Sequence, residues 1–250
     1  MGMSSEALQA ACEVGQRLLM ETQYLAAERA LAGAEAEALA SGDYDTLSRL
    51  YMPLQETRRQ IRQRCGEGVV HLRLLASGPD DQPDAERIVE EIPHGQLLVA
   101  GWGSIRPAME VRRLAAERGL YLETFLGAVY PVGAGRLVAI VPTADVSLPE
   151  DKVGSLDGLL GALPPHSLAF NETELLPGPR LGTPETYAHV MELWERLHLP
   201  YLAAADMLAD PLQKIQGYRR TIEVDYACEL AHQKLSAVAR ELGRRRREGR

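Results

Sequence analysis

The sequence has few aromatic residues and few cysteines. Of its 250 residues, only two are Phe, two are Trp and three are Cys. So few large aromatic side chains, beside abundant Ala and Leu, favour closely packed helices over an aromatic-rich β-sandwich. The three cysteines, Cys12, Cys65 and Cys228, are odd in number and far apart, which excludes a disulfide framework and a zinc knuckle. This cysteine usage predicts a reducing, cytoplasmic compartment.

Targeting, membrane and metal motifs are also missing. No run of 18 apolar residues occurs, so we expect no transmembrane helix. The first residues have no basic stretch followed by an apolar run, and position 6 is Glu, so neither a signal peptide nor myristoylation is expected. No two of the six histidines have the spacing of a helix-borne zinc site, so we predict no metal.

The charge is mostly negative, with local arginine clusters. The formal net charge of -8 keeps a chain soluble and argues against nucleic acid or a membrane as the partner. Arginines gather at positions 58–64 and 244–247. Solvated helix faces explain these clusters, but they leave association with RNA open as a further hypothesis, which would depend steeply on salt.

Apolar periodicity divides the chain into three segments. Residues 1–65 and 174–250 repeat apolar positions every three to four residues, as helices do. Residues 66–173 instead alternate short extended runs, at 69–75, 96–101, 121–129, 137–141 and 167–170, with amphipathic stretches at 84–91, 105–118 and 155–163. The predicted fold is α/β, with helical hairpins at both ends of a small, mostly parallel, Rossmann-like sheet covered by helices on both faces.

The two helical segments carry specific boundary signals. Ser41-Gly42-Asp43 interrupts the first segment, and Asp43 is suited to cap the next helix. Pro53 falls inside that helix and should kink or end it. Pro- and Gly-rich residues 174–182 predict a linker. The last helix is predicted to run from about Pro211 to Leu242, and a helix so long suggests packing on another helix or in a homodimer.

The first segment resembles one tetratricopeptide repeat. The similarity rests on Ala11-x-x-Val14-Gly15-x-x-Leu18 followed by Tyr24-x-x-Ala27-x-x-x-Leu31-x-x-Ala34. Small residues at 15, 27 and 34 would let paired helices approach closely. A further Tyr44-x-x-Leu47-x-x-x-Tyr51 is similar to the first helix of a second repeat, which then departs from the pattern. The resemblance covers about 60 residues and implies binding of protein partners; a generic helical hairpin is the alternative.

The best candidate for ligand binding is a glycine-rich turn. Gly101, Gly103, Ser104 and Arg106 follow an apolar run and open a predicted helix, and Glu123 comes about 20 residues later at what we take as the end of the next strand. This arrangement is similar to the dinucleotide-binding fingerprint, in which glycines and a helix N-terminus hold a pyrophosphate. Arg106 replaces the third glycine, so it is suited to grip a phosphate or carboxylate directly.

Other polar residues are expected at the same edge of the sheet. Ligands of open α/β sheets bind beyond the carboxyl ends of the strands. Those ends carry Ser77, Asp80, Asn171 and Glu172, which should converge on the glycine-rich turn if the strands are parallel. Capping, loop and strand-end roles are the alternative for these residues.

No catalytic residue is assigned. Ser104 does not lie in a Gly-x-Ser-x-Gly elbow. Cys65 lies beside arginines that would lower its pKa, and His71 is near in sequence, so a Cys–His pair is conceivable; ending a helix is the simpler role. The sequence therefore favours a non-catalytic interaction protein that binds a protein partner or itself, with an α/β core for a small anionic ligand and no cofactor. The alternative is an enzyme that binds a nucleotide or phosphate ligand at the Gly101–Arg106 turn.

Overall fold

The computed structural model describes residues 5–133, 135–149 and 154–248, and the chain divides into two compact units. The helical unit comprises Met1–Ile61 and His198–Arg250, and the α/β unit comprises Arg62–Leu197. The three predicted segments thus become two units, because the terminal helices share one core. Residues 1–4 and 249–250 of those segments lie outside the described residues. None of the described helices is both long and apolar enough to cross a membrane.

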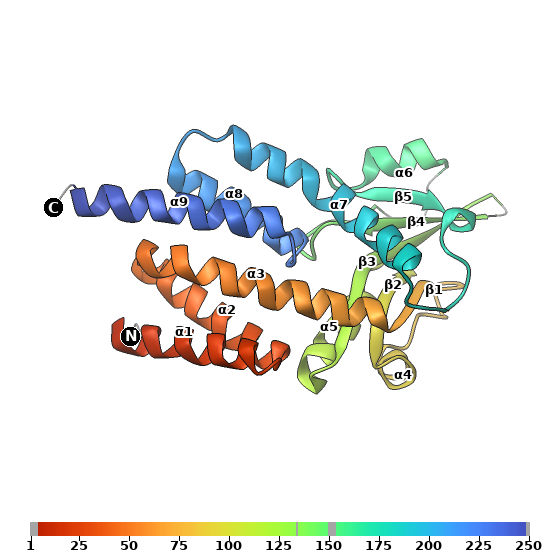
Figure 1. Cartoon of the computed structure of the whole chain (residues 1–250). Coiled ribbons are helices and arrows are strands. Elements are labelled where there is room, and N and C mark those ends of the chain that lie inside the picture. Colours follow the sequence, from red (N-terminus) through yellow and green to blue (C-terminus); the bar gives the residue numbers. More distant parts are fainter. Residues whose placement is uncertain (1–4, 134, 150–153, 249–250) are drawn as a thin grey trace. The chain divides into compact units, whose positions relative to one another are not determined.

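The helical unit is built from both ends of the chain. Its first part contains α1 (Ser5–Met20), α2 (Tyr24–Ser41) and α3 (Tyr44–Glu67) as far as Ile61. Its second part contains α7 (Pro184–Met207) from His198 onward, α8 (Pro211–Val224) and α9 (Glu229–Glu248). Figure 1 shows these helices packed side by side, with α1 and α2 as an antiparallel hairpin.

One apolar cluster holds the helical unit together. It combines buried side chains from all six helices: Leu8, Cys12, Leu31, Ala34, Ala38, Leu47, Leu50, Tyr51, Leu54, Leu202, Ala205, Ile215, Tyr218, Ile222, Cys228, Ala231, Leu235 and Ala239. Burying one leucine side chain contributes about 2 kcal/mol. Neither end of the chain could bury its apolar stripe alone, so the two ends depend on each other for stability.

The small residues of the repeat-like pattern do permit close helix packing. A Cβ atom on Gly15 of α1 would lie 2.6 Å from the buried side chain of Leu31 in α2. Ala27 and Ala34 are also buried. The turn after α2 follows its prediction: Gly42 is left-handed at φ 65°, and Asp43 Oδ1 accepts the Thr46 N–H at 3.0 Å. Membership of the tetratricopeptide-repeat family remains a prediction.

Two helix boundaries differ from the predictions. Of the two outcomes predicted at Pro53, a kink or the end of the helix, the second does not occur, because α3 continues through Pro53 to Glu67. The predicted helix from Pro211 to Leu242 is two helices, because the chain breaks at Asp225–Cys228 and α9 folds back on α8. Within this break, Asp225 accepts the N–H of Ala227 at 3.1 Å. Much of the apolar face of α9 is buried inside the unit, whereas Leu230 is 47% exposed; a homodimer through this helix stays a prediction.

A buried polar cluster joins α3 to α2 and α9. Arg58 donates to Glu28 at 3.0 Å and to Nε2 of His232 at 3.1 Å. The other ring nitrogen, Nδ1, lies 2.8 Å from the carbonyl oxygen of Cys228. A guanidinium only donates and a carbonyl only accepts, so His232 is neutral and carries its proton on Nδ1. Burial, reinforced by the charge of Arg58, lowers the pKa of His232 to about 4.

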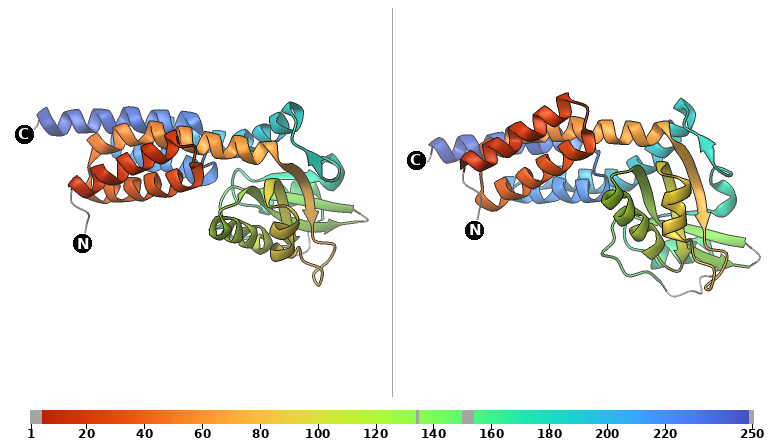
Figure 2. Two further views of the ribbon diagram at one scale, coloured as in Figure 1. Left: turned by 60° about the horizontal axis from the view of Figure 1, so that its bottom comes forward. Right: turned by 90° about the horizontal axis from the view of Figure 1, so that it is seen from below.

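The α/β unit follows the predicted order of strands and helices closely. It contains β1 (Val69–Leu75), α4 (Ala85–Glu91), β2 (His94–Trp102), α5 (Arg106–Arg118), β3 (Tyr121–Val132), β4 (Gly135–Val141), α6 (Leu156–Ala162), β5 (Leu168–Asn171), the short helix η1 (Glu172–Glu174) and β6 (Arg180–Leu181). The first part of α7, to Leu197, completes it. Figure 2 shows α4 and α5 on one face of the sheet.

The sheet is mixed and curled, so the expected mostly parallel, Rossmann-like sheet is not confirmed. Its strand order is β5-β4-β3-β2-β1-β6. Only β1–β2 and β2–β3 are parallel, whereas β3–β4, β4–β5 and β1–β6 are antiparallel. The hairpin after β3 reverses the chain direction, and β6 forms within the predicted linker. A mixed α/β core between helical ends is what the structure supports.

Helices pack on both faces of this sheet. One face packs on α4, α5 and α6 through an apolar cluster that includes Leu97, Val99 and Leu126. The other face carries Phe125, on which Trp194 of α7 stacks at a ring distance of 4.2 Å. The strand ends between these layers form the edge on which the predicted ligand site lies.

The packing at Gly15 predicts opposite effects for two Gly→Ala substitutions. Gly15→Ala should lower the free energy of unfolding by about 1–3 kcal/mol, because the added methyl group overlaps Leu31. Gly33→Ala should raise it by about 0.5–1 kcal/mol, because an added Cβ at this exposed position of α2 meets nothing. Urea unfolding of both variants measures the difference. Equal effects would contradict close packing at Gly15.

Two histidines of the helical unit, the buried His232 and the partly buried His198, predict opposite pH dependences. His232 resists protonation in the folded state, so stability should fall as the pH drops from 6.5 toward 4, by up to about 3 kcal/mol. Burial alone would lower the pKa of His198, but hydrogen bonds to Asp225 and Cys228 outweigh it and raise that pKa to about 9. The stability from His198 is therefore present below pH 6.5 and lost as the pH rises through about 9.

Urea unfolding between pH 4 and pH 10 tests both dependences. His232→Gln keeps an acceptor for Arg58 without titrating, so it should remove the acidic loss and leave the alkaline loss. His198→Gln should do the reverse, and each variant thus serves as the control for the other. If the loss of stability at low pH persists in His232→Gln and weakens in His198→Gln, the two histidines have been assigned to the wrong pH dependences.

Candidate functional site

The glycine-rich turn lies between β2 and α5, as predicted. Gly101 is buried near the end of β2. A Cβ atom there would lie 2.6 Å from the backbone carbonyl oxygen of Ser104 and 2.8 Å from Gln82 Oε1. That Gln82 oxygen accepts the Trp102 N–H at 2.9 Å. Gly103 has a φ of 55°, which favours glycine. Both glycines are therefore required by a tight turn, which Gln82 ties to the loop after β1.

A shallow depression of about 450 Å³ adjoins this turn. Its lining combines the loop after β1 with the first turn of α5: Gln82, Pro83, Ala85, Ser104, Arg106, Pro107 and Glu110. Arg106 is exposed at its rim. The structure thus brings Ser104 and Arg106 together beside a hollow, as the sequence suggested.

The first turn of α5 has few backbone donors for a phosphate. The N–H of Arg106 donates to Ser104 Oγ at 3.2 Å, and Pro107 has no N–H. A pyrophosphate cradle needs several free N–H groups at a helix N-terminus. An anion bound in this depression would therefore rely mainly on side chains, above all on the guanidinium of Arg106.

Glu123 does not lie where the sequence suggested. It is the third residue of β3 rather than near its end. Gly101 pairs with Ala128, so Glu123 lies five residues away along the strand (128 − 123), or about 17 Å. Its carboxylate pairs with Arg62 at 3.3 Å, and both side chains are at least nine-tenths buried. Glu123 balances a buried charge and is remote from the turn. The predicted extended run at 121–129 already puts Glu123 near its start, so placing this residue at a strand end was wrong.

Glu172 lies in an arginine cluster at the carboxyl edge of the sheet. Arg73 of β1 contacts its Oε1 at 2.6 Å. Arg136 of β4 binds both oxygens, through Nε at 2.7 Å and Nη2 at 2.9 Å, and donates from Nη1 to the carbonyl of Ala76 at 2.8 Å. We call Arg73, Arg136 and Glu172 the edge cluster. Hydrogen bonds from Arg136 and then from Arg73 hold the pKa of Glu172 below its usual value.

The curl of the sheet and an irregularity in β1 assemble the edge cluster. In a flat sheet, β1 and β4 would lie about 14 Å apart, three strand spacings of about 4.8 Å. The pairing register of β1 shifts between His71 and Leu74. There the N–H of Arg73 lies 3.3 Å from Nδ1 of His71. Such irregularities re-aim side chains, here the guanidinium of Arg73 toward Glu172.

The predicted site residues therefore fall into separate groups. Gly101, Gly103, Ser104 and Arg106 form the turn, and Glu172 belongs to the edge cluster. Asn171 ends β5 and donates to Glu174, and Ser77 donates to Asp81 in the loop after β1. No hydrogen bond or ion pair among the described residues joins the turn to the edge cluster. The expected convergence is thus only partial.

Arg73, Arg136 and Gln82 were not singled out from the sequence. Arg73 stands at a polar position of an alternating strand, and Arg136 stands at the start of one. An arginine within or at the start of a predicted strand is the feature of the sequence that could have drawn attention to each of them. Their common partner, Glu172, is 99 and 36 residues away, so nothing local connects them.

The helical unit has its own hollow, a narrow groove between α1 and α3. The groove encloses about 150 Å³ and is lined by Gln9, Cys12, Gln16, Leu31, Thr46, Arg49, Leu50 and Pro53. Cys12, Leu31 and Leu50 form a buried apolar floor. Gln9, Gln16 and Arg49 are exposed at the rim. These floor residues are almost fully covered, so the groove presents mostly polar groups to a ligand, and the more apolar surface nearby lies on the exposed face of α1.

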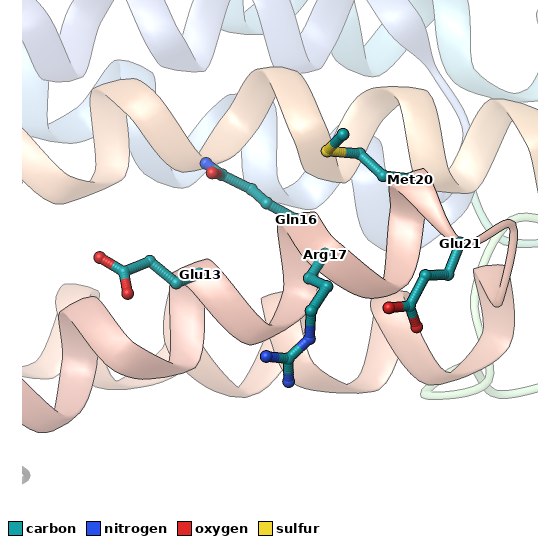
Figure 3. Close-up of a pocket in the computed structure, with 5 residues that line it drawn as sticks. All are labelled: Glu13, Gln16, Arg17, Met20 and Glu21. Carbon is teal, nitrogen blue, oxygen red and sulfur yellow. The ribbon is translucent and has the colours of Figure 1, made fainter.

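The exposed face of α1 extends this groove. A second, more open depression of about 490 Å³ is lined by Glu13, Gln16, Arg17, Met20 and Glu21. Figure 3 shows Gln16 and Met20 extending from one side of α1 and Arg17 and Glu21 from the other. Met20 is 85% exposed, and Gln16 lines both hollows. The two hollows therefore form one continuous surface along α1.

Nucleophilic and metal sites gain no support from the described residues. Burial, reinforced by Glu123, raises the pKa of Cys65 well above its usual value, opposite to the effect considered from its neighbouring arginines. A buried, protonated thiol is a poor nucleophile. Within residues 5–133, 135–149 and 154–248, no three His, Cys, Asp or Glu side chains are grouped so as to hold a metal ion.

Comparison of this chain with protein-family models, curated proteins and solved structures found no match. The geometry of the sites therefore carries the functional argument.

The buried pair of Glu123 and Arg62 predicts a structural role for Glu123. Glu123→Leu should lower the free energy of unfolding by about 3–5 kcal/mol, because it leaves the charge of Arg62 without this carboxylate. The double variant Arg62→Met with Glu123→Leu should lose less than the sum of the single variants. Glu117→Gln, at an exposed carboxylate of α5, should change stability by less than about 0.5 kcal/mol. Additive losses would argue against a coupled pair.

Proposed function

We propose that this chain is a non-catalytic interaction protein whose helical unit binds a peptide segment of a partner protein in the groove between α1 and α3. The groove itself is the observation that carries this proposal. It offers exposed Gln9, Gln16 and Arg49 above a floor of Cys12, Leu31 and other apolar side chains. The resemblance of α1 and α2 to a tetratricopeptide repeat supports the same function.

The size of the groove favours a peptide over a cofactor. Small-molecule sites usually measure about 300–1,000 Å³. A hollow of about 150 Å³ with a mostly polar surface suits one polar or acidic side chain of a peptide. The adjoining face of α1, with exposed Met20, provides the apolar contact for an anchor side chain next to it. Binding energy in such interfaces concentrates in a few anchors.

The charge at the rim indicates what the peptide carries. Within the described residues, the sole hydrogen bond from the Arg49 side chain goes to the backbone oxygen of Asp45, at 3.4 Å. Most of its five N–H donors are therefore left for a ligand, and an arginine pairs best with a carboxylate. We expect a peptide with an apolar anchor next to an acidic side chain or a terminal carboxylate.

The nucleotide-binding alternative has weaker support. The first turn of α5 offers Arg106 but few backbone donors, and Glu123 lies about 17 Å along the strand from Gly101. Two elements of the dinucleotide-binding fingerprint are therefore missing at the turn. A small anion at Arg106 is still compatible with the geometry, and Arg106→Ala should then abolish its binding.

A displayed library of random peptides tests the proposed function. Selected peptides should share an apolar residue beside an acidic one and should bind the purified chain saturably in fluorescence anisotropy. Gln16→Ala with Arg49→Ala should weaken binding by at least about tenfold, the equivalent of one lost anchor contact of about 1.4 kcal/mol.

A matched variant serves as the control. Gln233→Ala with Arg240→Ala removes the same residue types from exposed positions of α9, outside both hollows, and should leave the affinity unchanged. Circular dichroism and urea unfolding establish that both double variants fold. Selected peptides that bind the groove variant as tightly as the wild type would rule out this groove as the binding site.

A further inference from the structure

The edge cluster holds more positive than negative charge. Arg73 and Arg136 surround one carboxylate, that of Glu172. The three groups together carry a net charge of +1, and their side chains are 29%, 29% and 19% exposed. Partial burial strengthens their interaction with an anion, while exposure leaves a path for one to enter. The cluster therefore has the charge and the access of an anion site.

The two arginines are held in place independently of each other. Both lie on strands of the same sheet, β1 and β4. Arg136 is anchored by its hydrogen bond to the carbonyl of Ala76, and Arg73 is aimed by the irregularity at His71. Sites built on strands keep their geometry better than sites on loops. The two guanidinium groups are thus preorganised toward one point.

The carboxylate that fills this point lies on a much less regular element. Glu172 opens η1, a helix of only three residues after the last residue of β5. A second acidic residue, Glu174, lies in the same turn as Glu172. A short, exposed turn can change conformation at lower cost than two paired strands.

Arg73 also has unused hydrogen-bonding capacity. A guanidinium carries five N–H donors. In the part of the chain that the structure describes, the Arg73 side chain makes one hydrogen bond, from Nη2 to Glu172. A ligand with more oxygen atoms than one carboxylate could use the others. A phosphate group presents three or four, and a dicarboxylate presents four.

We propose that Arg73 and Arg136 form an anion-binding site for a small dianion, a phosphate or a dicarboxylate, and that Glu172 occupies this site from within the chain until the dianion displaces it. Two guanidinium groups match two negative charges, so a dianion neutralises the cluster where Glu172 leaves one positive charge. This site is distinct from the Gly101–Arg106 turn and from the peptide groove. It deepens the sequence-based expectation of a small anionic ligand by naming the residues that hold it.

Competition by Glu172 sets the expected affinities. While Glu172 occupies the site, only a fraction of the molecules has the site open to a ligand. The apparent dissociation constant is the intrinsic one divided by that fraction, so the apparent affinity is lower. Removing the charge of Glu172 should therefore tighten binding. We expect Glu172→Gln to bind inorganic phosphate at least about tenfold more tightly than the wild type, measured by isothermal titration calorimetry at low ionic strength.

Five further titrations identify the site and the ligand class. Glu174→Gln removes the same charge from the same turn without touching either arginine, so it should bind phosphate like the wild type. Adding Arg73→Ala or Arg136→Ala to Glu172→Gln should abolish the increase in affinity for phosphate. Succinate separates dicarboxylates from phosphates, and acetate, with a single charge, should bind more weakly than both at matched ionic strength.

Three results would overturn the proposal. The first is an increase in phosphate affinity in Glu174→Gln equal to that in Glu172→Gln, which would show that any loss of negative charge nearby has the same effect. The second is a folded Glu172→Gln protein that binds none of the dianions. The third is a wild type without saturable binding at about 100 times the dissociation constant of Glu172→Gln, because Glu172 is then not displaceable. If Glu172→Gln does not fold, Glu172→Asp replaces it, and its withdrawn carboxylate should give intermediate affinity.

Discussion

The structure of the helical unit depends on a core that residues about 200 positions apart build together. Leu31 and Leu47 from the first third of the chain, and Leu235 from the last, are all fully buried in it. Each of the two helical segments has an apolar stripe that it cannot cover alone. The α1–α3 groove follows from this arrangement, because α3 is held from its other side by α9 through Arg58 and His232. A binding surface on one end of the chain is thus positioned by the other end.

In the α/β unit the corresponding constraint is the curl of a mixed sheet. Curling lets the side chain of Arg136 on β4 reach the carbonyl of Ala76, just beyond β1. The edge cluster and the Gly101–Arg106 turn both result from strand ends meeting at one edge. They differ in chemistry: the turn presents one exposed arginine, whereas the edge cluster presents two that are already arranged around a carboxylate. The edge cluster can therefore distinguish ligands by both their charge and their shape.

Local signals predicted most of the elements. The apolar run at 96–101 became a fully buried stretch of β2, and the predicted stretch at 105–118 became α5, which ends at the left-handed Gly119. Errors arose where the outcome depends on contacts between distant residues. The break at Asp225–Cys228 lies within a continuous helical pattern, and it is fixed by α9 packing on α8. Strand direction is similarly undetermined by the residues of the strand itself: β5 pairs antiparallel with β4, and nothing in its four residues indicates this.

The sequence alone determined which stretches are helical or extended and which turn is built from glycines, because backbone preferences and apolar periodicity act within a few residues. Only the tertiary structure decided which charges meet. It paired Glu123 with Arg62, and it gave Glu172 two arginine partners. The physical reason is that a charge responds to whatever folding brings within a few ångströms, and the distance along the chain does not report that separation.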